Sequence, residues 1–204
     1  FWKAKSFDGM YIFKWNVVSV ATFYDTFTDV TLSDCTKHDI FNSWSEHRTM
    51  DESWNVTCYC TLKTSSELRS EIARWFIDPT SHVCGQDINT WNISRLTDLD
   101  GAFMDLSDFN SNISSWDTSK VTSLRETFLR ATSFTGDGVL NWDTSKVTNM
   151  VATFQGATSF TGDGVLNWNT SNVKSMAATF QGAISFTGDG VSSWDTSKVT
   201  DLRR

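Results

Sequence analysis

Four cysteines, Cys35, Cys58, Cys60 and Cys84, are the residues of this chain best suited to covalent chemistry. In an oxidising compartment they predict two disulfides, and three pairings are possible. A bond between Cys58 and Cys60 is disfavoured because the single intervening residue strains the disulfide geometry. We therefore expect Cys35 to pair with Cys58 or Cys60, and the remaining cysteine of those two to pair with Cys84.

The alternative for the cysteines is a zinc site, because His38 and His82 lie near Cys35 and Cys84 in the sequence. The spacings match no common pattern of structural zinc ligands well. The third histidine, His47, is isolated, and the chain has no nucleophile elbow, metal-binding helix motif or phosphate loop. The sequence therefore predicts a protein that is not an enzyme and holds no metal or cofactor.

N-glycosylation sequons provide a second kind of chemistry, at Asn55, Asn92, Asn112 and Asn169. Chance alone gives roughly three sequons in a chain with this content of Asn, Ser and Thr. Asn92 and Asn169 each follow a tryptophan of the repeat described next, at a position that we expect to point outward. All four asparagines are therefore candidates for glycosylation.

A tandem repeat positions most of these residues. Trp116, Trp142, Trp168 and Trp194 are spaced 26 residues apart, and Trp91 lies 25 residues before the first of them. A fixed period in this range is typical of a stacked solenoid, in which one unit cannot bury its apolar side alone. The pattern favours a binding or structural module over an enzyme.

Each repeat predicts three local structures. The segment Ser-Lys-Val-Thr suggests a short strand, the spacing from Met150 through Phe154 to Ala157 suggests a helical turn, and Gly136-Asp137-Gly138 suggests a tight turn. We expect a leucine-rich-repeat-like solenoid with a short parallel β-strand ladder, helical turns and helical caps. Successive strands would lie about 4.8 Å apart, and each Trp and Phe would stack on its equivalent in the next coil.

The period divides the chain into four parts. Residues 1–30 fit the end of a first array, and residues 31–64 form a cysteine-bearing cap with a helix. Residues 65–90, opening at Ser65-Ser66, predict the N-terminal cap helix of a second array, which continues as about five coils over 91–204. The alternative is a single array with one large insertion. Both ends of the sequence fall inside repeats, which suggests a piece of a longer protein.

Two surface ladders are candidates for binding. Asp137, Asp163 and Asp189 lie between glycines, where stacked carboxylates could bind calcium. Each coil offers only one of these aspartates, so we favour a turn in which Asp caps its own backbone.

The second ladder lies on the expected outer face of the strands. A solenoid of this kind binds its partners there, although a solvated face without a ligand is an equal alternative. This predicted face consists of Lys120, Thr122, Lys146, Thr148, Asn172, Lys174, Lys198 and Thr200.

Charge and hydropathy exclude some partners. The net charge of −7 argues against nucleic acid, whose phosphates require clustered Lys and Arg. No apolar run approaches the ~18 residues that a membrane-spanning helix needs, so no span is expected in this chain.

The repeat unit Phe-Thr-Gly-Asp-Gly-Val-x-x-Trp-Asp-Thr-Ser-Lys-Val-Thr resembles the BspA-like surface-protein repeats. These are divergent leucine-rich repeats of mycoplasma surface lipoproteins and marine microalgae. The segment 107–122 is most similar to their usual form, and 32–44 is similar to the cysteine-bearing cap of the algal members. Three turns here carry an extra glycine, which gives 26 residues instead of 25.

This resemblance implies an extracellular or cell-surface protein that mediates protein or glycan interaction, or adhesion, without catalysis. Its partners would be other surface proteins, glycans or copies of itself. The alternative is a structural subunit of an extracellular filament or cell covering.

Overall fold

The computed structural model describes residues 62–80, 82 and 84–203. The chain divides into two units, Phe1–Cys60 and Thr61–Arg204, and the described residues belong to the second. The predicted array over 1–30, nearly all of the predicted cap over 31–64, and Cys35, Cys58, Cys60 and Asn55 lie outside the described residues. Among those described, no helix has the length and apolar character needed to cross a membrane.

The second unit begins with the helix α2, Ser65–Ile77. Thr64 is the N-cap, since its hydroxyl accepts from the Glu67 backbone N–H at 3.1 Å. The Glu67 carboxylate in turn accepts from the Lys63 backbone N–H at 2.7 Å, which satisfies a second exposed donor. The helix predicted after Ser65-Ser66 is therefore confirmed, with its start set by Thr64.

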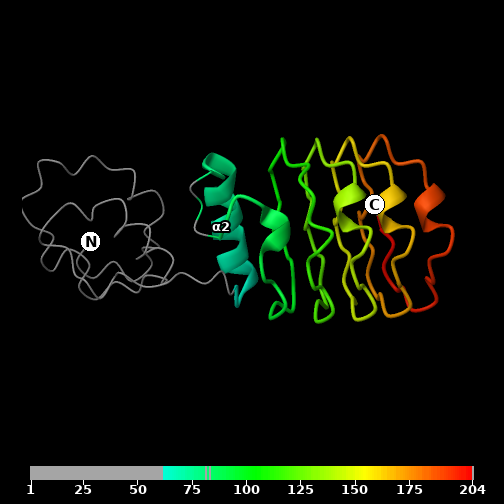
Figure 1. The fold of residues 1–204 in the computed structure, drawn as a ribbon. Helices are drawn as coiled ribbons and strands as arrows, with labels where there is room; N and C mark the ends of the chain where they lie inside the picture. The colour runs from blue at the N-terminus through cyan, green and yellow to red at the C-terminus, as the bar shows by residue number, and fades with distance from the viewer. Residues whose placement is uncertain (1–61, 81, 83, 204) are drawn as a thin grey trace, which may run out of the picture. The chain divides into compact units, whose positions relative to one another are not determined.

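One side of α2 covers the first coil of the stack (Figure 1). Leu68 and Ile72 are fully buried. Trp75 meets Trp91 edge to face, with ring centroids 6.5 Å apart, and its indole N–H donates to the Gln86 carbonyl at 2.8 Å. The helix thus closes the apolar interior at this end of the stack.

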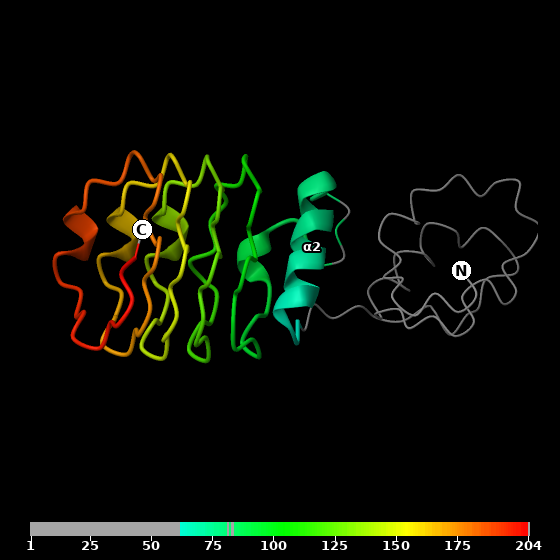
Figure 2. The same ribbon diagram turned by 180° about the vertical axis from the view of Figure 1, so that it is seen from behind.

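After α2 the chain forms successive coils that lie side by side (Figures 1 and 2). Counted from the repeat tryptophans, the coils comprise residues 91–115, 116–141, 142–167, 168–193 and the partial coil 194–203. Among the described residues after α2, helical structure is limited to four short 3-10 helices. One precedes the first coil, η3 Ile88–Thr90, and three lie within the coils: η4 Asp137–Val139, η5 Asp163–Val165 and η6 Asp189–Val191.

The core is a set of aromatic ladders. Trp142 stacks between Trp116 and Trp168, with centroid distances of 6.3 and 6.1 Å and interplanar angles of 5° and 6°. Phe154 stacks on Phe128 at 5.6 Å and, within its own coil, on Phe160 at 3.9 Å. The predicted stacking of equivalent rings is confirmed, and burial of one such side chain is worth roughly 1.5–3 kcal/mol.

The coils pair differently from the strands that the sequence predicts. The backbone N–H groups of Leu124, Glu126 and Phe128 each donate to a carbonyl of the next coil at 2.9 Å. Of the intervening N–H groups, that of Thr127 closes a turn within the coil to the Leu124 carbonyl at 3.2 Å, and that of Arg125 donates to the Asp100 carboxylate at 3.1 Å. Because the backbone alternates between bonds to the next coil and these other bonds, no extended strand forms here. The β-type pairing is a series of isolated parallel bridges, such as Ser123 with Asn149.

The helical turn also lies elsewhere than predicted. The segment from Met150 to Ala157 is a run of turns in which Ala152 and Gly156 have φ of 55° and 70°. Such left-handed residues cannot continue a right-handed helix. The 3-10 helices begin instead at the Gly-Asp-Gly turns, after a left-handed glycine such as Gly136, with φ 107°.

Close approach of neighbouring coils requires a glycine at one position of each turn. A Cβ on Gly164 would overlap the carbonyl of Gly136 in the preceding coil. The equivalent Gly138 is less crowded, since its Cβ would lie 3.0 Å from the Ser111 carbonyl oxygen. Neither Gly164 nor Gly138 has a positive φ, so the requirement is one of space.

We therefore predict that Gly164→Ala lowers the free energy of unfolding by about 3 kcal/mol, because a backbone carbonyl has to move. Gly138→Ala is the matched control and should cost about 1 kcal/mol, since its neighbour has to shift only slightly. Urea denaturation followed by circular dichroism measures both. An equal loss in the two variants would contradict the proposed packing of the turns.

Candidate functional site

The Asp-Thr-Ser cassette after each tryptophan sets the backbone that carries the lysines. The carboxylates of Asp117 and Asp143 accept from the backbone N–H of the serine two residues later, at 3.1 and 2.9 Å. The following threonine points inward: Thr144 is 3% exposed, and its hydroxyl donates to the Asn169 carbonyl of the next coil at 3.2 Å. Each cassette is thus a turn tied to its neighbour by a buried hydroxyl.

Sequence reasoning missed this role of the threonines. A second buried set, Thr127, Thr153 and Thr179, also bridges coils; Thr153 donates to the carbonyls of Leu124 and Met150, at 3.0 and 2.8 Å. The repeat pattern could not distinguish these threonines from exposed ones. They satisfy carbonyls in the interior, which makes them structural.

The lysines of the predicted face are exposed. Lys120, Lys146 and Lys174 make no hydrogen bond or ion pair through their ammonium groups within the described part of the chain. Lys198 differs, because it donates to the Asn172 side chain at 2.7 Å. Arg95, which the sequence analysis missed, is exposed and precedes Lys120 by 25 residues, so it belongs to the same column.

The threonines of the predicted face are bound to the coils. The hydroxyls of Thr122, Thr148 and Thr200 each donate to the carbonyl of the equivalent residue one coil earlier, at 3.0, 3.2 and 3.2 Å. Those hydroxyls are engaged within the stack, so they offer a partner fewer hydrogen bonds. The lysines are therefore the part of the predicted face best able to bind.

Hydrogen bonds also alter the acidity of the turn aspartates. The pKa values of Asp117, Asp143 and Asp195 are all lowered. For Asp117 and Asp143 the serine hydroxyl is the larger cause and the serine backbone N–H the next; for Asp195 the order is reversed. These carboxylates are thus held ionised close to Lys120, Lys146 and Lys198.

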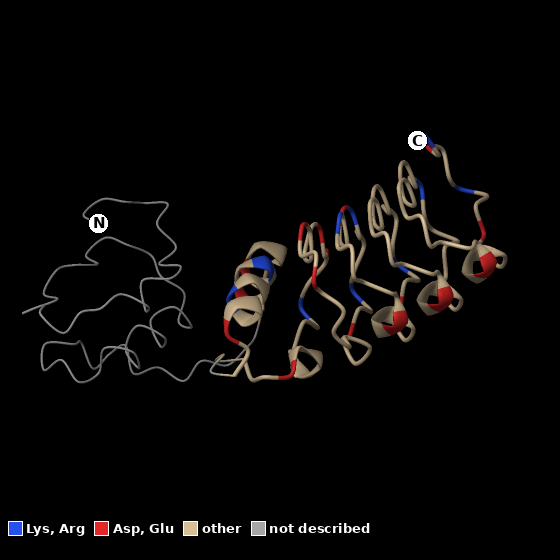
Figure 3. Ribbon diagram, turned by 90° about the horizontal axis from the view of Figure 1, so that it is seen from above, with Lys and Arg blue, Asp and Glu red and all other residues tan. Residues whose placement is uncertain are grey.

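The aspartates of η4, η5 and η6 follow one edge of the stack (Figure 3). Asp137 and Asp163 are exposed, and each accepts from a threonine hydroxyl two residues earlier, at 3.3 and 3.2 Å. The sequence predicts that these carboxylates accept from the backbone of their own turn. In the described coils they accept from the threonine hydroxyl instead.

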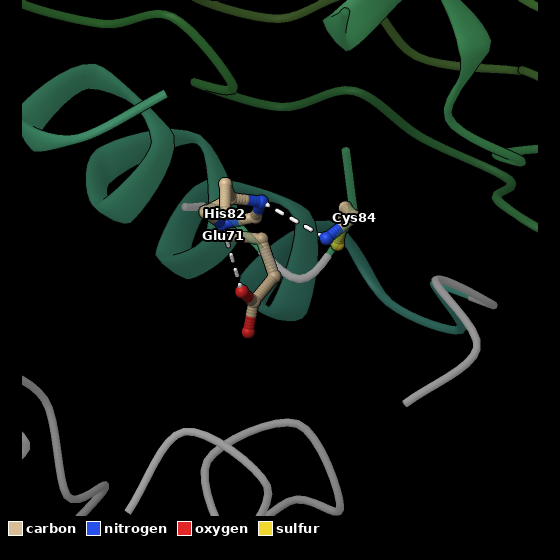
Figure 4. A group of neighbouring side chains, drawn as sticks. All are labelled: Glu71, His82 and Cys84. Carbon is tan, nitrogen blue, oxygen red and sulfur yellow. Dashed lines mark hydrogen bonds and ion pairs between the residues drawn. The ribbon is translucent and has the colours of Figure 1, made fainter. Parts of the chain in front are cut away.

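A group of possible metal ligands consists of Glu71, which belongs to α2, and of His82 and Cys84, which follow the helix (Figure 4). Donor atoms of Glu71, His82 and Cys84 lie within 4.8 Å of one another, and His82 Nε2 is 3.3 Å from a Glu71 oxygen. The sequence suggests His82 and Cys84 as alternative zinc ligands, whereas nothing in the spacing of Glu71 indicates that it joins them. Cys84 is not a free thiol, being disulfide-bonded, and such a sulfur is a poor zinc ligand.

Three of the four sequons lie within the described residues, and all three asparagines are exposed. Asn92 and Asn169 accept from the serine two residues later through both its N–H and its hydroxyl, at 3.1 and 2.8 Å in each case. Asn112 accepts from the Ser114 N–H at 3.0 Å. Their amide nitrogens, where a glycan would be attached, donate to no group in the described coils.

Stacked coils of one repeated unit, with an exposed column of basic residues, define this part of the chain as a repeat protein. The chain belongs to the family described as "Mycoplasma protein of unknown function, DUF285", which matches residues 70–164 and 135–204. No curated protein and no solved structure is significantly similar to it. The expectation of a mycoplasma-type repeat protein is thus met at the level of the family.

We predict that acid weakens the fold through its aspartates. The lowered pKa values of the turn aspartates, and of Asp201, which Arg203 holds at about 2, mean that the unfolded chain binds protons at a higher pH than the native one. These groups stabilise the fold above their ordinary pKa of about 3.9. That stability is lost as the pH falls through their folded pKa values, so the melting temperature should drop below pH 4.

Asp143→Asn tests the cause. Asn keeps the accepting oxygen, as Asn169 does at the equivalent position, but cannot be titrated. At pH 7 the Asp143→Asn variant should therefore have the melting temperature of the wild type, and its melting temperature should fall less on acidification. Asp143→Ala should have a lower melting temperature than the wild type at pH 7 and at acid pH. If the melting temperatures of Asp143→Asn and of the wild type fell in parallel down to pH 2.5, titration of Asp143 would not be a source of the loss of stability in acid.

Proposed function

We propose that this chain is a non-enzymatic part of an extracellular or cell-surface repeat protein, and that it binds partner proteins or glycans through its lysine column. We use the name lysine column for Arg95, Lys120 and Lys146, which share one repeat position in successive coils, together with Lys174, which lies beside them at the repeat position of Thr148. The observation that supports it most is the exposure of the three lysines, whose ammonium groups form no hydrogen bond or salt bridge among the described residues. Asp117 and Asp143 lie close enough to Lys120 and Lys146 to interact with them through their charges, and a more strongly anionic partner would have to compete with these carboxylates.

The stack provides the physical basis for binding. Neighbouring coils in hydrogen-bonded register lie about 4.8 Å apart, which is closer than the Debye length of about 8 Å at physiological salt. Ammonium groups on such a column repel one another, and an anionic partner relieves that repulsion. The aromatic core holds the coils in one register, so little order is lost on binding. A carboxylated or sulfated glycan, or an acidic protein surface, fits this column.

Several further expectations belong to the proposal. The fold would be a divergent leucine-rich-repeat solenoid, in which the parallel bridges between coils take the place of the strand ladder. Cys84 would pair with Cys58 or Cys60 and Cys35 with the other, which stabilises a secreted protein. Asn55, Asn92, Asn112 and Asn169 would be available to glycosylation enzymes. No cofactor is required; calcium at the Gly-Asp-Gly turns would need more ligands than one aspartate per coil.

An immobilised sulfated polysaccharide is a suitable probe, because a protein of net charge −7 is retained on it only through a local basic surface. We expect retention at low salt. Lys120→Gln and Lys146→Gln should each weaken binding about two- to fivefold, as for an exposed ion pair of 0.2–1 kcal/mol, and each should reduce the salt dependence.

Lys63→Gln is the matched control, because Lys63 is exposed, carries the same charge and precedes α2 instead of lying on the column. It should leave retention unchanged. Absence of retention at any salt concentration, or an equal loss in the Lys63 variant, would remove the lysine column as the binding surface.

The alternative function is a subunit of an extracellular filament or covering. Analytical ultracentrifugation distinguishes the two functions: the binding module stays monomeric as concentration rises, whereas a filament subunit assembles.

A further inference from the structure

The repeat changes its length within the described coils. Phe109 and Trp116 are seven residues apart, whereas Phe134 and Trp142 are eight apart because of the extra glycine in the turn. A 26-residue coil therefore lies against a shorter one at this single step. Later steps join coils of equal length, and there Gly164 packs directly against the Gly136 carbonyl.

A hollow of about 310 Å³ lies at this step, on the edge that carries η4. Its lining includes Asn110 and Asn112 from the shorter coil, and Asp137, Leu140 and Asn141 from the longer one. The lining residues thus come from the two coils that differ in length, and the hollow lies where the spacing of the turns changes.

The hollow is lined by both amide and carboxylate groups, and some of these groups have no hydrogen-bonding partner among the described residues. Asn141 makes no hydrogen bond through its side chain within the described coils, and the Asn112 amide nitrogen donates to none. Asp137 offers a carboxylate of which one oxygen is bonded to Thr135. Beside these groups Leu140 is 41% exposed, as its equivalent Leu166 is in the next coil at 50%, and it supplies an apolar surface to the hollow.

These features favour a neutral ligand that is polar at its rim and apolar on one side. The residues lining the hollow include no Lys, Arg or His, which disfavours phosphate or another anion. They include only one carboxylate, which is too few for calcium. A volume near 300 Å³ is at the small end of ligand sites. Only a small ligand fits this combination.

We infer that the hollow between Asn112 and Asn141 binds a sugar ring. The ring hydroxyls would accept from the amide nitrogens of Asn112 and Asn141 and donate to the carboxylate of Asp137, and the C–H face of the ring would cover Leu140. Two sources of this chemistry exist: a saccharide of a partner, or the first sugar of a glycan attached to Asn112. In the second case the Asn112 nitrogen is bonded to the sugar itself, and Asn141 and Asp137 make the contacts with the ring hydroxyls. The inference deepens the proposed function by naming a glycan site, and it does not depend on the lysine column.

The first experiment uses the full chain made without glycosylation and labelled at its leucine methyl groups. A panel of neutral hexoses, N-acetylhexosamines and their disaccharides is titrated while the methyl signals of Leu140 and Leu166 are followed by NMR. We expect a saturable shift at Leu140 with at least one sugar, and none at Leu166, its equivalent one coil later.

Matched variants assign the polar contacts. Asn141→Ala should weaken sugar binding at least fivefold, whereas Asn167→Ala, at the equivalent exposed position of the next coil, should leave it unchanged. Both side chains are exposed, so neither variant endangers folding. An equal effect of the two variants would overturn the assignment.

The second arm distinguishes the source of the sugar. Protein made in a glycosylating host is compared with its Asn112→Gln variant by intact mass and by the Leu140 methyl signal. A glycan mass that depends on Asn112, together with a Leu140 shift in the same protein, places the attached sugar in the hollow. If neither free sugars nor an attached glycan shifted Leu140 more than Leu166, the inference would be wrong. Retention on the sulfated polysaccharide would be unaffected, so failure here leaves the lysine column standing.

Discussion

The structure depends on hydrogen bonds between coils, because one coil has too little regular secondary structure to satisfy its own backbone. Trp142 illustrates this: its ring fills the core, and its indole N–H donates to the Ile113 carbonyl of the preceding coil at 3.1 Å. Trp168 and Trp194 repeat the bond to Val139 and Val165. A coil without its neighbour would leave such carbonyls unpaired in an apolar interior, at about 1–3 kcal/mol each. The unit is therefore stable only within a stack.

The same bonds explain why the repeat is so regular in sequence. A tryptophan shifted by one residue would lose both its stacking partners and its carbonyl, so the spacing tolerates little variation. Where the spacing does change, between the coils that contain Phe109 and Phe134, the surface opens into a hollow while the aromatic ladder continues, with those two rings 5.9 Å apart. Differences in surface chemistry can therefore arise on a core that stays the same.

The helix α2 meets a different requirement from that of the coils. It ends the stack with an apolar side and also carries buried charge: Glu71 and Arg74 lie 3.6 Å apart and are both more than nine-tenths buried. His82 joins Glu71 and stacks on Trp91 at a centroid distance of 5.0 Å. Buried ionic groups favour one arrangement over others when each has a partner. We interpret this group as a device that sets how α2 sits on the first coil.

The sequence by itself determined the period, the rings that stack and the helix at Ser65, because aromatic spacing and capping residues act over short distances along the chain. It also indicated which side chains of the lysine column lie outside. Tertiary structure alone decided that Thr144 and Thr153 point inward, that turns with positive φ replace the expected helical turn, and that Glu71 meets His82. The physical reason is that each of these outcomes depends on a neighbour about 25 residues away or on another element. A threonine is buried where its hydroxyl can donate to a carbonyl of a neighbouring coil. The same residue without such a carbonyl would face water.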